Sequence, residues 1–335
     1  MSYFEQNKAD MIAYLQKGCK PKGTALRFGV ELEHFIVKKD TKEAVSYYGE
    51  KGVETILKQL LPFYEKKDYS EEHLIALARK DIAISLEPAA QLEVSISPQE
   101  EIEEIGKIYE KFVVEIAPVL EQLDYEMVTA GYQPASKVEN LELIPKDRYR
   151  FMDAYFAKIG PYGRQMMRGT AATQVSIDYY SEDDFKEKYK AAYQLMESLS
   201  VMYENTPVYE CQDWKEGSPR AKIWKNTDKR RFAVEPFMEN GTISFEGYVD
   251  FIMQAPIIVN KQNGVEFYDE KTIGEICAER RLTEDEMIHA MSMVFPMIRA
   301  KQFLEIRYAD SMPIERVLKY VNEIKRTVSS SKEFE

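Results

Sequence analysis

The chain carries the run Arg27-Phe28-Gly29-Val30-Glu31-Leu32-Glu33-His34-Phe35 close to its N-terminal end. Apolar and charged residues alternate along this run, and residues two apart in a β-strand point to the same side. One side would therefore carry Arg27, Glu31 and Glu33, whereas the other side would be apolar. The run predicts a strand with one buried face and with two neighbouring glutamates on its polar face.

Three further runs repeat this alternation. Their polar faces carry Gln91, Glu93 and Ser95 in one run, Gln174, Ser176 and Asp178 in the next, and Glu305 and Arg307 in the last. Each run alone is compatible with an ordinary half-buried strand whose outer face is solvated. Together they gather Glu, Arg and Gln with hardly any Lys, and neighbouring glutamates repel one another unless a cation lies between them. The runs therefore favour a Mg²⁺ site on a shared sheet face, because Mg²⁺ prefers oxygen ligands.

The remaining periodicity defines the expected fold class. Helical spacing is clearest at 3–18, 49–64, 99–123, 146–159, 181–203 and 313–326. Strand alternation occurs at 25–37, 81–96, 126–132, 170–179 and 303–308. Ser97 followed by Pro98, and Ser181 followed by three acids, are typical helix starts. Because the strands do not alternate regularly with crossover helices, the pattern predicts an α+β fold with an antiparallel or mixed sheet.

Composition narrows the class of protein. The 335 residues are 44% hydrophobic and 30% charged, which is typical of a globular protein, and no Gly/Ser/Pro-rich linker divides them. We therefore expect one domain over residues 1–335, with a loose tail at 329–335. The formal net charge of −12 counts against a nucleic-acid partner.

The cysteine spacing, the first residues and the lengths of the apolar runs bear on the redox state and the compartment of the protein. Cys19, Cys211 and Cys277 are far apart and form no CxxC pattern, so that neither a disulfide framework nor a zinc site is expected. The first residues do not resemble a signal peptide, and no apolar run reaches the ~18–20 residues of a membrane span. We expect a cytoplasmic protein with no membrane partner. The sequence does not indicate an oligomeric state.

Further motifs follow in order along the chain. They are Leu86-Glu87-Pro88, Met166-Met167-Arg168 with Thr170-Ala171, Glu204-Asn205-Thr206-Pro207, Ser218-Pro219-Arg220 with Trp224, Thr227-Asp228 with Arg231, and Arg299 with Leu304-Glu305-Ile306-Arg307 and Asp310. With the runs above, they resemble the plant-type (and proteobacterial) branch of the glutamate–cysteine ligases over roughly residues 25–312. The resemblance implies a glutamine-synthetase-like catalytic domain, whose antiparallel sheet cups ATP, Mg²⁺ and amino-acid substrates with helices packed behind.

The resemblance also implies an activity. In such enzymes ATP phosphorylates the γ-carboxylate of glutamate, and the amine of cysteine then displaces phosphate to give γ-glutamylcysteine, the first step of glutathione biosynthesis. Two alternatives stay open: a carboxylate–amine ligase with another amine or acid, and a non-catalytic protein that keeps the nucleotide-binding fold. No P-loop or GxGxxG motif occurs, so nucleotide binding would not use a helix N-terminus in the Walker manner.

Phosphoryl transfer to a carboxylate requires metal ions and fixed cations that neutralise the phosphates. We expect two or three Mg²⁺ ions, for which Mn²⁺ can substitute. Their candidate ligands are Glu31, Glu33, Glu87, Glu93 and Glu305. Glu87 is alternatively a plain turn residue before Pro88. Arg299 and Arg307 are the candidate catalytic residues that meet phosphate, unless they pair structurally with the same glutamates.

Five residues are candidates for substrate binding. Arg220 has the planar fork that suits a carboxylate, although an arginine in a polar loop can equally be a surface residue. Trp224 would wall the amino-acid pocket or belong to the core. Arg168, Thr170 and Gln174 would line the glutamate site. The histidines show no triad or metal spacing, and His34 is expected to be structural.

Overall fold

The fold is built around an antiparallel sheet, which the computed structural model of residues 1–233, 238 and 243–330 describes. Within these residues the sheet has nine strands, in the order β12-β13-β7-β1-β5-β4-β3-β2, and β6 also pairs with β1. The strands are β1 (Phe28–Lys38), β2 (Lys66–Ser70), β3 (His73–Ala78), β4 (Ile82–Leu86), β5 (Leu92–Gln99), β6 (Tyr125–Val128), β7 (Ala172–Ile177), β12 (Ile298–Ala300) and β13 (Leu304–Asp310). The predicted α+β class with an antiparallel sheet is confirmed.

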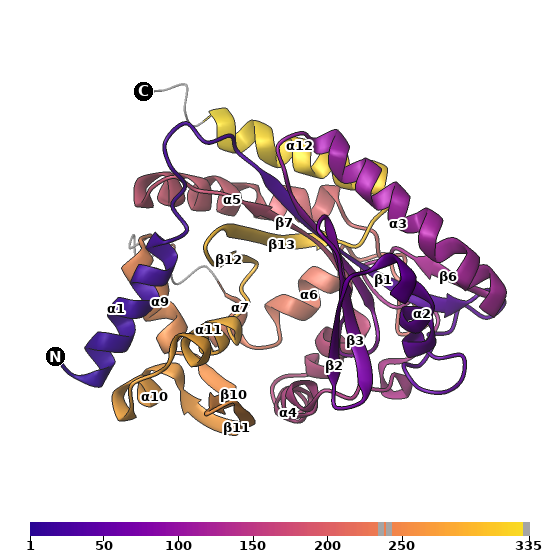
Figure 1. Ribbon diagram of the computed structural model, residues 1–335, viewed down its shortest axis with the longest axis horizontal. Helices are drawn as coiled ribbons and strands as arrows, with labels where there is room; N and C mark the ends of the chain where they lie inside the picture. Colours follow the sequence, from indigo (N-terminus) through magenta and orange to yellow (C-terminus); the bar gives the residue numbers. More distant parts are fainter. Residues whose placement is uncertain (234–237, 239–242, 331–335) are drawn as a thin grey trace.

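One face of the sheet is covered by long helices. These are α3 (Ile102–Leu123), α5 (Glu182–Met202) and α12 (Ile314–Ser330), which lie along one side of the sheet in Figure 1. Helix α3 contacts β5 and α12, and α5 contacts β13 and α12. In β1 the apolar side chains of Phe28, Val30 and Leu32 are at most 1% exposed. Their burial leaves the opposite, polar face of the sheet for the functional site.

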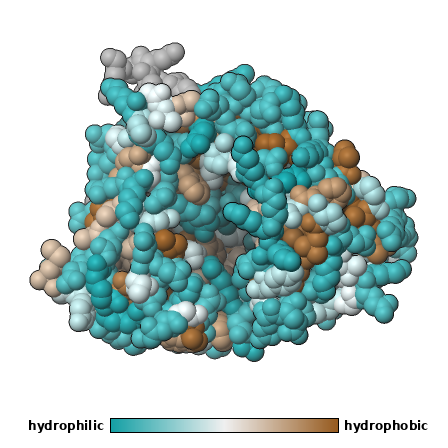
Figure 2. Space-filling model, in the orientation of Figure 1, coloured by the Kyte–Doolittle hydropathy of each residue, from teal (hydrophilic) through white to brown (hydrophobic). Residues whose placement is uncertain are grey.

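The other face is bordered by shorter elements. These are α4 (Asp147–Phe156), η3 (Gln165–Gly169), α6 (Pro219–Lys225), α7 (Lys229–Phe232), α9 (Phe245–Met253), the hairpin β10 (Pro256–Gln262) and β11 (Val265–Thr272), α10 (Ile273–Glu279) and α11 (Glu284–Ser292). The hairpin contacts α4 and α11, while α1 (Tyr3–Gln16) contacts α9 and α10. Figure 2 shows this part of the molecule hollowed near its centre, with largely hydrophilic residues around the hollow.

The long helices agree closely with the periodicity. The six predicted helices correspond to α1, α2 (Val53–Leu60), α3, α4, α5 and α12, and the side chain of Ser181 caps α5 by accepting a hydrogen bond from the Asp184 amide. The helix start at Ser97 is wrong, because β5 continues through Gln99 and α3 begins only after Glu101. The strand expected at 81–96 is two strands, β4 and β5, joined by a tight turn.

Three short elements complete the description. They are η1 (Leu61–Phe63), η2 (Val138–Asn140) and the small hairpin of β8 (Val208–Tyr209) and β9 (Gln212–Asp213). None of the helices in the described residues combines the length and apolar character that crossing a bilayer requires. Helix α12 extends through Ser330, and residues 331–335 of the expected tail lie outside the described residues. The single domain over 1–335 stays a prediction.

Candidate active site

Three of the predicted glutamates share the polar face of the sheet. Glu33 of β1 is the direct Cα partner of Glu93 of β5, and Glu31 lies two residues from Glu33 on the same side. Glu87 joins them from the turn between β4 and β5, where its amide donates to the Gln91 carbonyl at 2.9 Å. All four side chains line one pocket of about 290 Å³, called here the acidic pocket. Glu87 is therefore both a turn residue and a pocket residue.

The pKa values of all four carboxyls are raised above the ordinary value of a glutamate. Burial is the main cause, and the charge of neighbouring glutamates adds to it. Together they raise the pKa of Glu31 to about 8 and those of Glu33, Glu87 and Glu93 to about 7. A bound cation would reverse this effect, because it stabilises the ionised form of every carboxyl near it.

Hydrogen bonds fix two of these carboxylates. Glu33 accepts from the Ala172 amide and from Gln174 Nε2, both at 2.8 Å. Glu93 accepts from Ser85 Oγ at 2.8 Å. The donors come from β7 and β4, the strands that flank the β1–β5 pair, so the sheet itself orients the acids.

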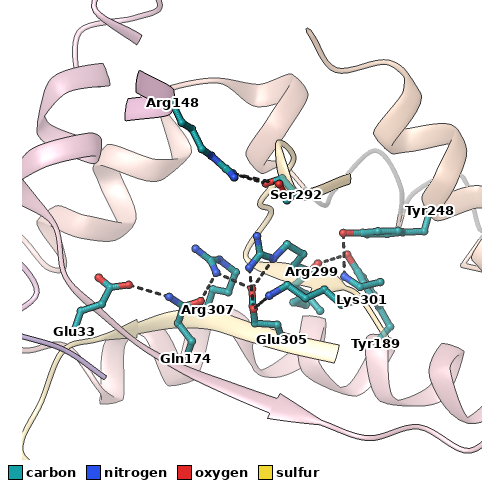
Figure 3. A network of polar contacts seen from close by, with 12 residues as sticks. Glu33, Arg148, Gln174, Tyr189, Tyr248, Ser292, Arg299, Lys301, Glu305 and Arg307 are labelled. Carbon is teal, nitrogen blue, oxygen red and sulfur yellow. Dashed lines mark hydrogen bonds and ion pairs between the residues drawn. The ribbon is translucent and has the colours of Figure 1, made fainter. Parts of the chain in front are cut away.

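Glu305 has a different environment from the other four. Figure 3 shows three cations gathered on its carboxylate: Arg299 at 2.6 and 2.8 Å, Lys301 at 2.6 Å and Arg307 at 2.6 Å. Burial disfavours its charge, but these cations outweigh burial and hold the pKa of Glu305 well below its ordinary value. The predicted pairing of Arg299 and Arg307 with a glutamate is thus present. The role of Glu305 as a metal ligand stays a prediction.

Gln174 links the acids to the cations. Its Nε2 donates to Glu33, and its Oε1 accepts from Arg307 Nη1, which also contacts Glu305. Figure 3 shows these side chains in one connected row above the sheet. The site therefore has an acidic half and a cationic half joined by one neutral amide.

Arg220 and Trp224 form one wall of the acidic pocket. Arg220 is only 1% exposed, so the surface-arginine alternative is wrong. Its Nη2 donates to the Arg307 carbonyl at 2.7 Å, and its guanidinium lies 5.3 Å from the centroid of the Trp224 ring. Trp224 is 7% exposed and packs on Phe232, so it is a core residue that also lines the pocket.

The other two candidate substrate residues differ in position. Thr170 lines the pocket, although its hydroxyl donates to the Met166 carbonyl at 2.8 Å. Arg168 does not line the pocket. Its guanidinium holds Asp153 at 2.7 and 2.6 Å and donates to the Leu141 carbonyl at 2.8 Å, which braces the η3 turn. Arg168 therefore lies outside the acidic pocket, and its role in substrate binding stays a prediction.

Three cations in the pocket were not predicted. Lys301 is two residues after Arg299 and four before Glu305, a spacing that could have identified it. Lys146 and Arg148 lie at the start of α4 and reach the pocket only through tertiary packing, so no local sequence pattern indicates them. Arg148 Nη2 donates to Ser292 Oγ at 3.3 Å, across from α4 to the end of α11 (Figure 3).

Comparison with known proteins identifies the family. Residues 27–325 match the family model described as glutamate–cysteine ligase family 2. The chain belongs to this family. It is 30% identical over 326 residues to glutamate–cysteine ligase A of Oryza sativa subsp. japonica, and 30% identical over 319 residues to the Arabidopsis thaliana enzyme, both named as chloroplastic. Each alignment covers 92% of this chain, but only 64% and 60% of those relatives, so the chain spans less than two thirds of their length.

A solved glutamate–cysteine ligase has the same fold. It is the Francisella tularensis glutamate–cysteine ligase in complex with AMP, which aligns with 92% of this chain and 67% of its own at a TM-score of 0.50 and 12% identity. At this identity the likeness shows the fold, and the expected glutamine-synthetase-like architecture is confirmed. His34 also agrees with expectation, since its buried ring bonds Tyr109 Oη at 2.9 Å and the Leu92 carbonyl at 3.2 Å.

The donor chemistry of the acidic pocket fits the divalent cation expected for a glutamate–cysteine ligase. Carboxylate oxygens are hard ligands, and a cation would relieve the repulsion that raises their pKa values. In the part of the chain that the structure describes, no three Asp, Glu, His or Cys side chains are arranged to hold a metal by themselves. Water and phosphate oxygens would therefore complete any coordination shell, as is usual for Mg²⁺.

Proposed function

We propose that this chain joins the γ-carboxylate of L-glutamate to the amine of L-cysteine at the expense of ATP, forming γ-glutamylcysteine, ADP and phosphate. One observation carries the proposal: four carboxyls with raised pKa values and a three-cation cluster line the same pocket, joined through Gln174. A carboxylate that is to be phosphorylated needs both halves, because charge on the phosphates must be neutralised while they are held in line.

The acidic half would hold Mg²⁺. Glu31, Glu33, Glu87 and Glu93 would each contribute oxygens to one or another of two or three ions, with water and phosphate completing the ligands, and the ions would neutralise charge on the β- and γ-phosphates. In their protonated state these carboxyls are poor metal ligands, so binding would be accompanied by proton loss. Mn²⁺ fits the same oxygen donors.

The cationic half would receive the transferred phosphoryl group. Arg299, Lys301 and Arg307 all contact Glu305, which keeps three positive charges together in a buried place. An entering phosphoryl group would compete with Glu305 for these donors. Their hydrogen bonds would then stabilise the oxygens on which charge builds up in the transition state.

The wall formed by Arg220 and Trp224 would bind an amino-acid substrate. The guanidinium can hold a carboxylate through two parallel bonds, while the indole and the neighbouring Phe295 keep water from the reactive acyl group. Water exclusion matters here because an activated γ-carboxyl would otherwise be hydrolysed.

A carboxylate–amine ligase with a different amine or acid is the second candidate, because the shared phosphorylation machinery does not depend on the amine. Release of phosphate from ATP and Mg²⁺ would be measured with glutamate and, in turn, cysteine, serine, glycine or ammonium. We expect release to require glutamate and to be fastest with cysteine, with γ-glutamylcysteine found by mass spectrometry. Faster release with another amine would favour the second candidate, and no release with any acid or amine would reject both.

A further inference from the structure

Four aromatic rings close one side of the acidic pocket. They belong to Phe156, Trp224, Phe232 and Phe295 and are called here the aromatic wall. Ring centroids are 4.8 Å apart for Trp224 and Phe232 and 5.1 Å apart for Phe232 and Phe295, separations at which aromatic pairs attract. Trp224 and Phe295 line the pocket itself, so their positions decide how well this side of the pocket excludes water.

Phe295 lies where no regular element holds it. Residues 293–297 follow α11 and precede β12, and they belong to no helix or strand. Arg231 of α7 supplies bonds there instead. Its Nη1 donates to the Met293 carbonyl, its Nη2 donates to the Pro256 carbonyl at 2.5 Å, and its guanidinium lies 5.7 Å from the centroid of the Phe295 ring. One side chain thus joins the start of β10 to the stretch that carries Phe295.

Asp228 in turn holds Arg231. Its Oδ2 lies 3.5 Å from Arg231 Nε and accepts from Tyr155 Oη at 2.9 Å, and its Oδ1 accepts from the Arg230 amide at 3.2 Å. Arg231 is 0% exposed and Asp228 is 3% exposed. Neither residue lines the acidic pocket, so direct contact with substrate does not explain the pair.

A buried ion pair is a costly way to fill a core. The loss of hydration can exceed the attraction between the charges, so apolar residues of the same volume would often stabilise the fold equally well. A guanidinium can do what an apolar side chain cannot, because its planar group of donors forms directed bonds to two carbonyls at once. Here one of those bonds fixes the backbone two residues before Phe295. The pair is therefore suited to fix the place of a ring.

We propose that Asp228 and Arg231 are positioning residues that hold Phe295 against the aromatic wall, so that ATP cleavage is coupled to amide formation. The inference rests on the proposed function, because it takes an activated γ-carboxyl as the group that the wall protects. In the productive step the amine nitrogen bonds to the γ-carbon, the bond from that carbon to the phosphate oxygen breaks, and the amine loses a proton. Attack by water would instead return glutamate and phosphate, and one ATP would be lost without product.

The test disturbs the pair and leaves the rings in place. Arg231→Lys retains the charge but loses the planar group that bonds both carbonyls, and Asp228→Asn removes the counter-charge but retains an oxygen acceptor. Arg280→Lys is the matched control, because Arg280 also pairs with an acid (Glu286, 2.6 Å) and bonds a backbone carbonyl (Lys261, 3.0 Å) but does not line the acidic pocket. Thermal unfolding of each variant checks that it is folded. If Arg231→Lys does not fold, the milder Asp228→Asn carries both measurements.

Two measurements report on the wall. The first is the ratio of phosphate released to γ-glutamylcysteine formed, with ATP, Mg²⁺, glutamate and cysteine present, together with the KM for ATP. The second does not depend on activity. The chain has two tryptophans, so in a Trp214→Phe background the quenching of fluorescence by acrylamide reports on Trp224 alone. Trp224 is 7% exposed, and its quenching should therefore be weak when the pair is intact.

We expect a ratio of about one in the wild type and in Arg280→Lys, and of about two or more in Arg231→Lys and Asp228→Asn, because water would then compete with the amine. Quenching of Trp224 should be stronger in both variants of the pair and unchanged in the control. The KM for ATP should be unchanged, since the pair does not line the pocket.

An unchanged ratio or unchanged quenching in the folded variants of the pair would overturn the inference, as would an equal change in Arg280→Lys. Slower turnover at an unchanged ratio would mark Asp228 and Arg231 as a structural ion pair only. If the wild-type chain makes no product with any amine, the proposed function fails, and the quenching of Trp224 still decides whether the pair holds the wall.

Discussion

Glu33 of β1 and Glu93 of β5 face each other directly across one antiparallel ladder, with their side chains on the same face of the sheet. Like charges in this position destabilise a sheet. Burial and the charge of neighbouring glutamates together raise both pKa values to about 7. Without a bound cation, the pair therefore destabilises the fold. A cation bound between the two carboxylates would remove their repulsion.

Removal of one member of this pair should separate stability from activity. Glu93→Gln removes a charge but retains the shape of the side chain, so we expect turnover to be abolished and the free energy of unfolding without metal to be unchanged or higher. Urea denaturation in EDTA and phosphate release would be measured on the same preparation. The control is Glu100→Gln, an exposed position directly after β5, the strand that contains Glu93. An active but destabilised Glu93→Gln would show that Glu93 has a structural role instead.

Substitution of Glu305 should change the free energy of unfolding in the opposite direction. The buried carboxylate neutralises Arg299, Lys301 and Arg307, so Glu305→Gln leaves three half-buried cations without their counter-charge. We expect a loss of about 3–5 kcal/mol in the free energy of unfolding, the usual cost of breaking a buried ion pair. Denaturation of Glu93→Gln and Glu305→Gln side by side would measure the difference. Equal stability of the two variants would mean that the cations do not depend on Glu305.

The raised pKa values predict how stability changes with pH. Between pH 6.5 and 8, the folded chain still holds protons on Glu31, Glu33, Glu87 and Glu93 that the unfolded chain has already lost. The free energy of unfolding without metal should therefore fall as pH rises through this window. His34 and His289 have lowered pKa values and act in the opposite sense, but only below about pH 6.5. Urea titrations at several pH values should show a shallower fall in Glu93→Gln than in the wild type, and identical slopes would contradict this account.

A substitution of Arg220 tests whether the wall formed by Arg220 and Trp224 binds an amino-acid substrate. Arg220→Lys retains the charge but loses the planar fork, so we expect the KM for one amino acid to rise by at least about tenfold, or roughly 1.4 kcal/mol. The KM for ATP should hardly change, because the phosphates are assigned to Mg²⁺, Arg299 and Arg307. Arg168→Lys is a useful comparison, since the Arg168 side chain is only 15% exposed but bonds Asp153 outside the pocket. A selective rise in the KM for ATP in Arg220→Lys would move Arg220 to the nucleotide site.

Much of the site could be predicted because strand alternation is strictly local. Once Glu31, Glu33 and Glu93 are on strands, the period of two fixes which face they share, and antiparallel pairing brings them together. The same reasoning placed Gln174 opposite the apolar side of β7. It also predicted one strand at 81–96, although Pro88 indicated a possible turn, because the alternation resumes directly after the turn in which Ala90 adopts a positive φ of 63°.

Other parts of the site depend on tertiary packing that no local pattern reports. Lys146 and Arg148 precede and begin a helix with ordinary surface composition, and they reach the pocket only because α4 packs beside the β10–β11 hairpin. The hairpin itself was not predicted. Arg220 looked like a loop arginine, since its burial comes from the contact with the Arg307 backbone, 87 residues further along the chain.

The claim that glutamate is activated by phosphorylation can be tested with an isotope. Glutamate labelled with ¹⁸O in its γ-carboxylate would be incubated with ATP, Mg²⁺, cysteine and the chain, and the released phosphate analysed by mass spectrometry. Because the amine displaces the whole phosphoryl group together with the carboxylate oxygen, we expect one ¹⁸O atom in each phosphate released and none when EDTA is present. Turnover to γ-glutamylcysteine with unlabelled phosphate would contradict the account, since ATP would then be cleaved without activating the carboxylate.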